Sequence, residues 1–212
     1  MGLIAGGGDL PAAVAARFGP TPSPLNAFLI GQGLETLSLR IERHVSNALA
    51  VAQFLHARPE VTSVSYAGLP SSPWHERARK YAPRGAGSVL GFVLEGGKEA
   101  GIAFVDALSL HSHVANIGDV RSLVIHPAST THAQLSEDEQ LAAGVEPGFV
   151  RLSVGTEGIE DILADLEAGF AALAATESTS PTRTESVVDP VADGGPAASS
   201  TARADAAAEP AA

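Results

Sequence analysis

The sequence FVRLSV, residues 149–154, predicts a β-strand with a single arginine among apolar residues. A guanidinium group that leaves water without a partner costs free energy, so we expect Arg151 to be held for a partner. Its planar fork of N–H donors suits a carboxylate, which can accept two parallel hydrogen bonds. The pattern alone favours the commoner use of arginine, in which the side chain reaches solvent from a sheet edge or pairs with a protein carboxylate.

A long amphipathic helix is predicted over residues 23–58. Ser23 is a suitable N-cap, Pro24 suits the first helical position, and Pro59 ends the segment. Gly31 and Gly33 are expected to mark a bend or a close packing contact. The apolar stripe that indicates the helix is formed by Leu34, Leu37, Ile41, Val45, Ala48, Ala52 and Leu55, at spacings of three and four residues.

Shorter strands and helices alternate through the rest of the chain. Strands are predicted at residues 61–66, 89–94 and 123–125, in addition to 149–154. Helices are predicted at residues 74–82, 100–108, 136–143 and 159–173, and Ser136 with Glu139 forms a capping box. The alternation predicts an α/β fold in which helices pack on a mixed or antiparallel sheet.

The two ends of the chain differ from this middle part. Residues 3–5 are predicted as a short strand, followed by a glycine turn and an alanine-rich helix. From residue 176 the sequence has no aromatic residue and few large aliphatic ones. Such a segment cannot bury enough apolar area to offset its ordering entropy, so residues 176–212 are predicted to form a disordered acidic tail.

Composition excludes several classes of partner. The net charge of −11 argues against nucleic acid and against an anionic membrane surface. No segment has the ~20 apolar residues that a membrane helix requires. The chain has no cysteine, which excludes disulfides and thiolate catalysis. Together these features indicate a cytoplasmic protein.

The histidines and serines do not form a recognisable catalytic or metal-binding motif. His111 and His113 could share one face of a strand, but no Asp or Glu lies close enough in sequence to complete a ligand set. Asp119 is a possible third ligand at an unfavourable distance, so a metal site is disfavoured. No serine lies in a G-x-S-x-G sequence, which leaves a hydrolase triad without a nucleophile. Ser129 and His132 are close in sequence, and their proximity is interpreted as structural.

Four longer motifs resemble one enzyme family. They are SPLNAFLIGQGLETLSLRIERH, YAGLPSSPWHERARKY, HSHVANIGDVRSLVIHPASTTHAQL and GFVRLSVGTEGIEDILADL. They resemble the C-terminal part of O-acetylhomoserine sulfhydrylases, which are pyridoxal-phosphate-dependent transferases of fold type I. The resemblance implies a connecting helix at 23–58 and a small C-terminal α/β domain at 59–175, and it leaves residues 1–22 unmatched. It also implies a small-molecule amino-acid substrate and a family that forms homo-oligomers.

The resemblance assigns roles to three residues. It implies that Arg151 binds the α-carboxylate of the amino-acid substrate, that Asn116 helps to hold that carboxylate, and that Thr131 lies near the substrate. The implied reaction is a γ-replacement of acetate by sulfide or a thiol, with pyridoxal 5'-phosphate as cofactor. Neither Lys80 nor Lys98 has the sequence context of the family's cofactor-binding lysine.

Two hypotheses follow from this partial match. In the first, the chain holds the substrate-binding half of an active site, has no catalytic residue of its own, and is inactive alone. In the second, it is a non-catalytic binding or assembly module derived from the family. The second hypothesis predicts a large exposed apolar patch along the helix between Leu34 and Leu55.

Overall fold

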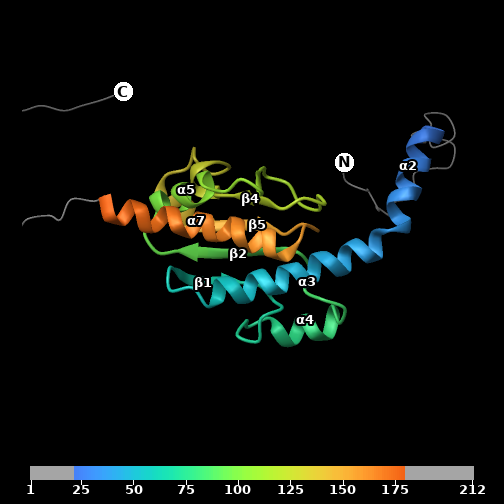
Figure 1. Ribbon diagram of the computed structural model, residues 1–212, viewed down its shortest axis with the longest axis horizontal. Coiled ribbons are helices and arrows are strands. Elements are labelled where there is room, and N and C mark those ends of the chain that lie inside the picture. The colour runs from blue at the N-terminus through green and yellow to red at the C-terminus, as the bar shows by residue number, and fades with distance from the viewer. Residues whose placement is uncertain (1–21, 180–212) are drawn as a thin grey trace, which may run out of the picture. The chain divides into compact units, whose positions relative to one another are not determined.

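A computed structural model describes residues 22–179 (Figure 1). The features expected before residue 22 and after residue 179 lie outside the described residues. In chain order the elements are α2 (Pro24–Glu35), α3 (Leu37–His56), β1 (Val61–Ser65), α4 (His75–Tyr81), β2 (Val89–Leu94), α5 (Gly97–Asp106), β3 (Ser112–His113), β4 (Leu123–Ile125), the 3-10 turn η1 (Pro127–Ser129), α6 (Glu137–Ala142), β5 (Phe149–Ser153) and α7 (Ile159–Thr179).

The five strands form one mixed sheet in the order β1-β2-β5-β4-β3. The first three pairings in this order, β1 with β2, β2 with β5 and β5 with β4, are antiparallel. The two-residue strand β3 runs parallel to β4. The strand that carries Arg151 therefore lies at the centre of the sheet, with a neighbour on each side.

Helices α3, α5 and α7 pack against one face of this sheet, and α3 and α7 lie side by side across it (Figure 1). Alternate strand residues, among them Phe92, Val150 and Leu152, point into this layer and are fully buried. Phe104 of α5 packs edge-on against Phe92 and against Phe170 of α7, with ring centroids 5.5 Å and 5.0 Å apart. This apolar core fixes β5 and leaves its other face for a site.

The helix expected over residues 23–58 is divided in two by the structure. α2 ends at Glu35 and α3 begins at Leu37, with Thr36 at φ −103° and ψ 5° between them. Glycine is a poor helix former, so Gly33 weakens this region, and its carbonyl oxygen accepts a hydrogen bond from the Arg40 guanidinium. The local sequence thus favours two helices, and the side-chain bond from Arg40 stabilises the break.

The apolar stripe is also shorter than the sequence indicates. Its C-terminal members Ala48, Ala52 and Leu55 are fully buried, whereas Leu34 and Ile41 are exposed. The sheet and α7 cover α3 from about His44 onwards. The large apolar residues before that point are exposed in the part of the chain that the structure describes, from 39% for Leu37 to 66% for Leu39.

Several local predictions are confirmed. Strands at 89–94 and 123–125 have the expected bounds. The Ser136 hydroxyl accepts from the Glu139 N–H, and the Glu139 carboxylate accepts from the Ser136 N–H at 2.8 Å. The last helix differs, because α7 continues to Thr179 and so passes the predicted start of the tail at residue 176. None of the helices in residues 22–179 is long and apolar enough to cross a membrane.

Candidate functional site

Arg151 projects from the face of the sheet opposite the helix layer. It pairs with Gly91 of β2 and with Ile125 of β4, and directly opposed residues in antiparallel strands share a face. Its neighbours Val150 and Leu152 point into the core. The Phe149 ring fills the space above Gly91 on this face, because an added Cβ at Gly91 would lie 2.5 Å from that ring.

The guanidinium group of Arg151 is only partly satisfied. One terminal nitrogen donates to the carbonyl oxygen of Asn116 at 3.3 Å. The Nε–H is buried and has no hydrogen-bond partner among residues 22–179. No carboxylate in this part of the chain forms a salt bridge with the group. The sequence left open that Arg151 pairs with a protein carboxylate, and no such pair is observed among residues 22–179.

Asn116 meets Arg151 through its backbone and not through its side chain. Its own amide oxygen accepts from the Ile117 N–H at 2.8 Å, and its N–H donates to the Val114 carbonyl at 3.0 Å. These bonds stabilise the exposed loop between β3 and β4. The structure thus brings the Asn116 backbone and the Arg151 guanidinium group together.

Thr131 lies at an open cavity beside this arginine. The cavity has a volume of about 430 Å³ and is lined by His113, Ala115, Ile125, Thr130 and Thr131. Ile125 is the direct cross-strand partner of Arg151, so the cavity and the arginine are neighbours on one face of the sheet. The hydroxyl of Thr131 is 2.9 Å from His132 Nδ1. All three predicted site residues are therefore near one another.

A buried histidine that sequence reasoning missed holds the threonine turn in place. His126 is fully buried, and its Nε2–H donates to the Pro147 carbonyl at 2.7 Å. Its Nδ1 is then the acceptor for the Ser129 hydroxyl, at 2.8 Å. Burial lowers the pKa of His126, which favours this neutral form. The carbonyl of the same residue accepts from the Thr130 hydroxyl at 2.8 Å, which links the buried ring to the cavity wall.

The contact between His111 and Asp165, which the sequence also did not predict, anchors the segment that leads into β3. The Asp165 carboxylate accepts hydrogen bonds from the N–H groups of Ser109, Leu110 and His111, from the Ser109 hydroxyl, and from His111 Nδ1 at 2.7 Å. Burial opposes ionisation of Asp165, but the bonds from the His111 ring and the backbone hold its pKa well below the ordinary value. Burial lowers the pKa of His111.

This pair accounts for one of the two histidines considered as metal ligands. His111 is buried against Asp165, whereas His113 is exposed at the cavity. Within residues 22–179 there is no group of three or more His, Asp or Glu side chains arranged to hold a metal ion. The spacing of Asp165 from His111, 54 residues, gave no sequence signal for their contact.

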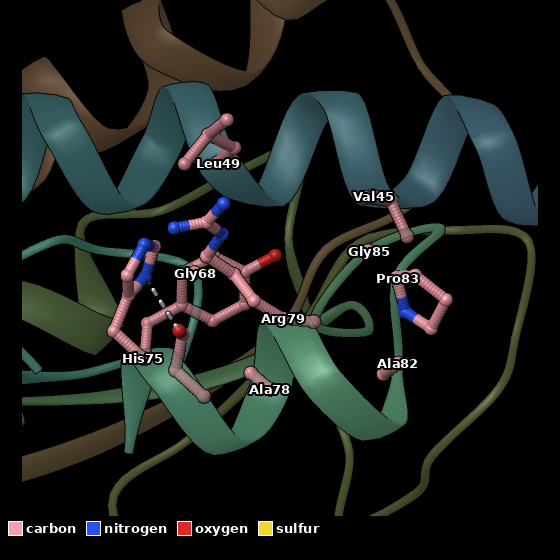
Figure 2. A pocket seen from close by; sticks show the side chains of 12 residues that line it. Val45, Leu49, Gly68, His75, Ala78, Arg79, Ala82, Pro83 and Gly85 are labelled. Atoms are coloured by element: carbon pink, nitrogen blue, oxygen red, sulfur yellow. Dashed lines mark hydrogen bonds between the residues drawn. The ribbon is translucent and has the colours of Figure 1, made fainter. Parts of the chain in front are cut away.

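A second cavity, of about 180 Å³, lies between α3 and α4 (Figure 2). Its lining is mainly small and apolar, with Val45, Leu49 and Ala78 among the residues. His75 Nδ1 donates to the Ala67 carbonyl at 3.2 Å at one side of it. No group in this lining duplicates the partly satisfied guanidinium of Arg151, so the cavity beside β5 is the stronger candidate site.

The site and fold together define an α/β module with an arginine that can receive an anion. Comparison with known proteins adds the family. The model of the Cys/Met metabolism PLP-dependent enzyme family matches residues 2–171, and the chain belongs to this family. The match begins before residue 23, where the sequence motifs begin.

Three relatives illustrate the similarity. The O-acetyl-L-homoserine sulfhydrylase of Corynebacterium glutamicum is 55% identical over 155 residues, which are 73% of this chain and 36% of the relative. The O-succinylhomoserine sulfhydrylase of Pseudomonas aeruginosa is 41% identical over 175 residues, which are 81% of this chain and 43% of the relative. The crystal structure of a putative O-acetylhomoserine (thiol)-lyase from Campylobacter jejuni contains a pyridoxyl-lysine monophosphate. It matches this chain with a TM-score of 0.67 at 40% identity, and the match covers 77% of this chain and 40% of the Campylobacter chain.

The chain thus spans well under half the length of these relatives. The family's cofactor is pyridoxal phosphate, and a lysine carries it in the Campylobacter structure. Lys80 and Lys98 are the only two lysines of this chain, and both are exposed, on α4 and α5. Neither lines the cavity beside Arg151. The described residues therefore do not fit covalent attachment of the cofactor.

Proposed function

We propose that this chain supplies the carboxylate-binding part of a pyridoxal-phosphate-dependent O-acetylhomoserine sulfhydrylase. The whole enzyme would replace the γ-acetate of O-acetylhomoserine with sulfide or a thiol. The observation that carries the proposal is the partly buried guanidinium of Arg151, whose Nε–H has no partner in residues 22–179. An amino-acid carboxylate would satisfy this donor and a terminal N–H in parallel.

The proposed site divides the work among three residues. Arg151 binds and orients the α-carboxylate. Asn116 holds the guanidinium through its carbonyl oxygen, which limits the rotation of a long side chain. Thr131 stands at the cavity wall on a turn fixed by the buried His126 and offers a hydroxyl to the polar part of the substrate. Orientation of the substrate in this way lowers the entropy cost of the reaction.

The acetyl ester is proposed over the succinyl ester on the basis of the relatives. The O-acetyl enzyme of Corynebacterium is 55% identical to this chain, against 41% for the O-succinyl enzyme of Pseudomonas. No described residue fits the cofactor, so we propose that the chain is inactive alone. The chemistry would need a cofactor-bearing part from the remainder of the family fold.

The proposal can be tested in a reconstituted enzyme. The full chain is combined with the part of the Corynebacterium relative that lies outside the match, and γ-replacement is followed by release of acetate. An Arg151→Lys substitution keeps the charge but loses the two-bond fork, and we expect kcat/KM to fall about 100-fold. Arg121→Lys is the matched control, because Arg121 is exposed and lies in the neighbouring loop. Equal activity of the two variants would refute the assigned role.

An assembly module without catalytic function is the second candidate, and the exposed apolar residues of α2 favour it. The patch differs in position from the one expected between Leu34 and Leu55, because it lies on α2 and on the first turns of α3. This candidate predicts self-association of the chain. Light scattering that shows a well-folded monomer would count against it.

A further inference from the structure

The cavity between α3 and α4 is bounded mainly by small residues (Figure 2). Val45 and Leu49 of α3 form one side of it. The opposite side is formed by α4 and the loops beside it, through Ala67, Gly68, Ala78, Ala82, Pro83, Gly85 and Ala86. Protein interiors normally contain few voids larger than a water molecule. About 180 Å³ of space beside these apolar residues is therefore an exception, and it is large enough for a ligand.

Gly85 closes one end of this cavity. Its φ of +140° lies in a region that L side chains rarely adopt, and an added Cβ would lie 2.3 Å from the Val45 side chain. Glycine therefore lets the loop after α4 approach α3 at this point. The Gly85 N–H donates to the carbonyl oxygen of Ala82 at 3.0 Å. This end of the cavity is thus fixed by the backbone.

Two polar side chains in the lining are already paired with backbone carbonyls. The hydroxyl of Tyr66, a residue that is 3% exposed, donates to the Gly87 carbonyl at 2.9 Å. His75 Nδ1 donates to the Ala67 carbonyl at 3.2 Å. A buried water needs about two to four polar partners, so an apolar space with its polar groups engaged suits an apolar group better than water.

The edge of the cavity carries positive charge. Residues 74–84 contain four of the 13 Lys and Arg residues of the chain but one of its 24 Asp and Glu residues. Among these four cations, Arg79 lines the cavity. Its one salt bridge within residues 22–179, to Glu76 at 3.5 Å, is exposed on both sides, and such pairs contribute little free energy. The Arg79 guanidinium is therefore available to an anion.

We propose that this cavity binds a small organic carboxylate with an apolar ring. The ring would lie among Val45, Leu49 and Ala78, and the carboxylate would accept hydrogen bonds from Arg79 at the edge. An apolar cavity of about 150 Å³ is sufficient for benzene, so a volume of about 180 Å³ accommodates one six-membered ring. This inference does not rest on the proposed function.

Other occupants account for fewer of these observations. An inorganic anion would pair with Arg79 and leave the apolar space empty. A neutral hydrocarbon would fill the space and gain nothing from the local excess of cations. O-acetylhomoserine has no ring, and its ammonium group would be repelled by the cations of residues 74–84. An apolar ring with one negative charge matches both the space and its edge.

Nuclear magnetic resonance of the full chain with ¹³C-labelled valine and leucine methyl groups tests the proposal, with phenylacetate as the probe. We expect saturable shifts of the Val45 and Leu49 signals, with a dissociation constant on the order of 1 mM. Phenylacetamide has the same ring without the charge and should bind about 10-fold more weakly. Ala78→Leu, which fills the space, should abolish the shifts. Ala142→Leu, at an exposed position of α6, is the control and should retain them.

Arg79→Gln tests the charged edge of the cavity. This variant should bind phenylacetate about 10-fold more weakly and phenylacetamide equally well, because only the carboxylate uses the guanidinium. Arg77→Gln is the matched control with a smaller effect, because Arg77 lies over the Trp74 ring on the same helix and does not line the cavity. Arg151→Lys should leave the shifts unchanged, which separates this cavity from the proposed carboxylate site. Circular dichroism verifies that each variant is folded.

Four results would overturn the inference. The first is the absence of a saturable shift at Val45 and Leu49 up to about 10 mM phenylacetate, ten times the expected constant. The second is equal binding of phenylacetamide. The third is an equal effect of Arg79→Gln and Arg77→Gln. The fourth is a shift that persists in Ala78→Leu. Loss of γ-replacement activity in a reconstituted enzyme would bear on the proposed function alone.

Discussion

Replacement of Asp165 by asparagine should remove a large part of the stability of the chain. Asp165 is 7% exposed and accepts five hydrogen bonds from residues 109–111. In Asp165→Asn one carboxylate oxygen becomes an NH₂ group. If the remaining oxygen keeps the bonds from Ser109 and Leu110, the NH₂ faces the N–H and the ring of His111.

The expected loss is about 3–5 kcal/mol. The neutral His111 ring can change tautomer and accept from the new NH₂ group, but the backbone N–H of His111 cannot. A buried donor without a partner costs about 1–3 kcal/mol. The other bonds lose their ionic acceptor, and bonds to charged groups contribute about 1 kcal/mol more than neutral ones. Total stabilities of domains are about 5–15 kcal/mol, so this change would be large.

Urea unfolding followed by far-ultraviolet circular dichroism measures the difference in free energy of unfolding at pH 7. Glu160→Gln is the matched control, because Glu160 is exposed on the same helix and should change stability by less than about 0.5 kcal/mol. A loss below about 1 kcal/mol in Asp165→Asn would show that the five bonds do not anchor the segment before β3.

Three further outcomes are expected. Burial lowers the pKa of His111 in the folded chain, so as pH falls the unfolded chain binds a proton at this histidine before the folded chain does. The free energy of unfolding should therefore decrease below about pH 6.5. The pKa of Asp165 is also lowered in the folded chain, so protonation of this carboxylate should decrease the free energy of unfolding further below about pH 4. Urea titrations across this pH range measure both losses, and a free energy of unfolding that does not change with pH would contradict them. Gly148→Ala should destabilise the chain by about 2 kcal/mol, because its Cβ would lie 2.3 Å from the Leu94 carbonyl oxygen, whereas Gly31→Ala, in open space within helix α2, should be neutral or stabilising. Pyridoxal phosphate added to the full chain should give no visible aldimine band, and a strong band lost on substitution of either lysine would refute the assignment of both as surface residues.

Local patterns predicted most of the strands and helix ends. The alternation around residues 89–94 and the capping box at Ser136 depend on neighbours in sequence, and both are present in the structure. A bend or a close packing contact was predicted at Gly31 and Gly33, but the break itself lies at Thr36. Its position was not predictable, because the apolar stripe continues across it and the bond from Arg40 to Gly33 has no periodic signature. The exposure of Leu34 likewise depends on where the sheet ends, which periodicity does not encode.

The site was predictable in part. Arg151 stands out within its own strand, since one cation among apolar residues requires an explanation. Its contact with Asn116 and the nearness of Thr131 depend on pairing between strands that are distant in sequence. The buried partners of His111 and His126 were missed for the same reason, because the acceptors Asp165 and Pro147 lie 54 and 21 residues away.

The central claim is that the free donor of Arg151 binds an amino-acid carboxylate, and nuclear magnetic resonance of the arginine Nε–H groups tests it most directly. The full chain labelled with ¹⁵N is titrated with O-acetyl-L-homoserine, and Arg151→Lys assigns the signal by its disappearance. We expect a saturable shift of the Arg151 Nε–H with a dissociation constant on the order of 1 mM, which corresponds to about −4 kcal/mol for half a site. The signal of the exposed Arg121 should stay constant. An Arg151 signal that does not move, or that moves no more than that of Arg121, would contradict the account.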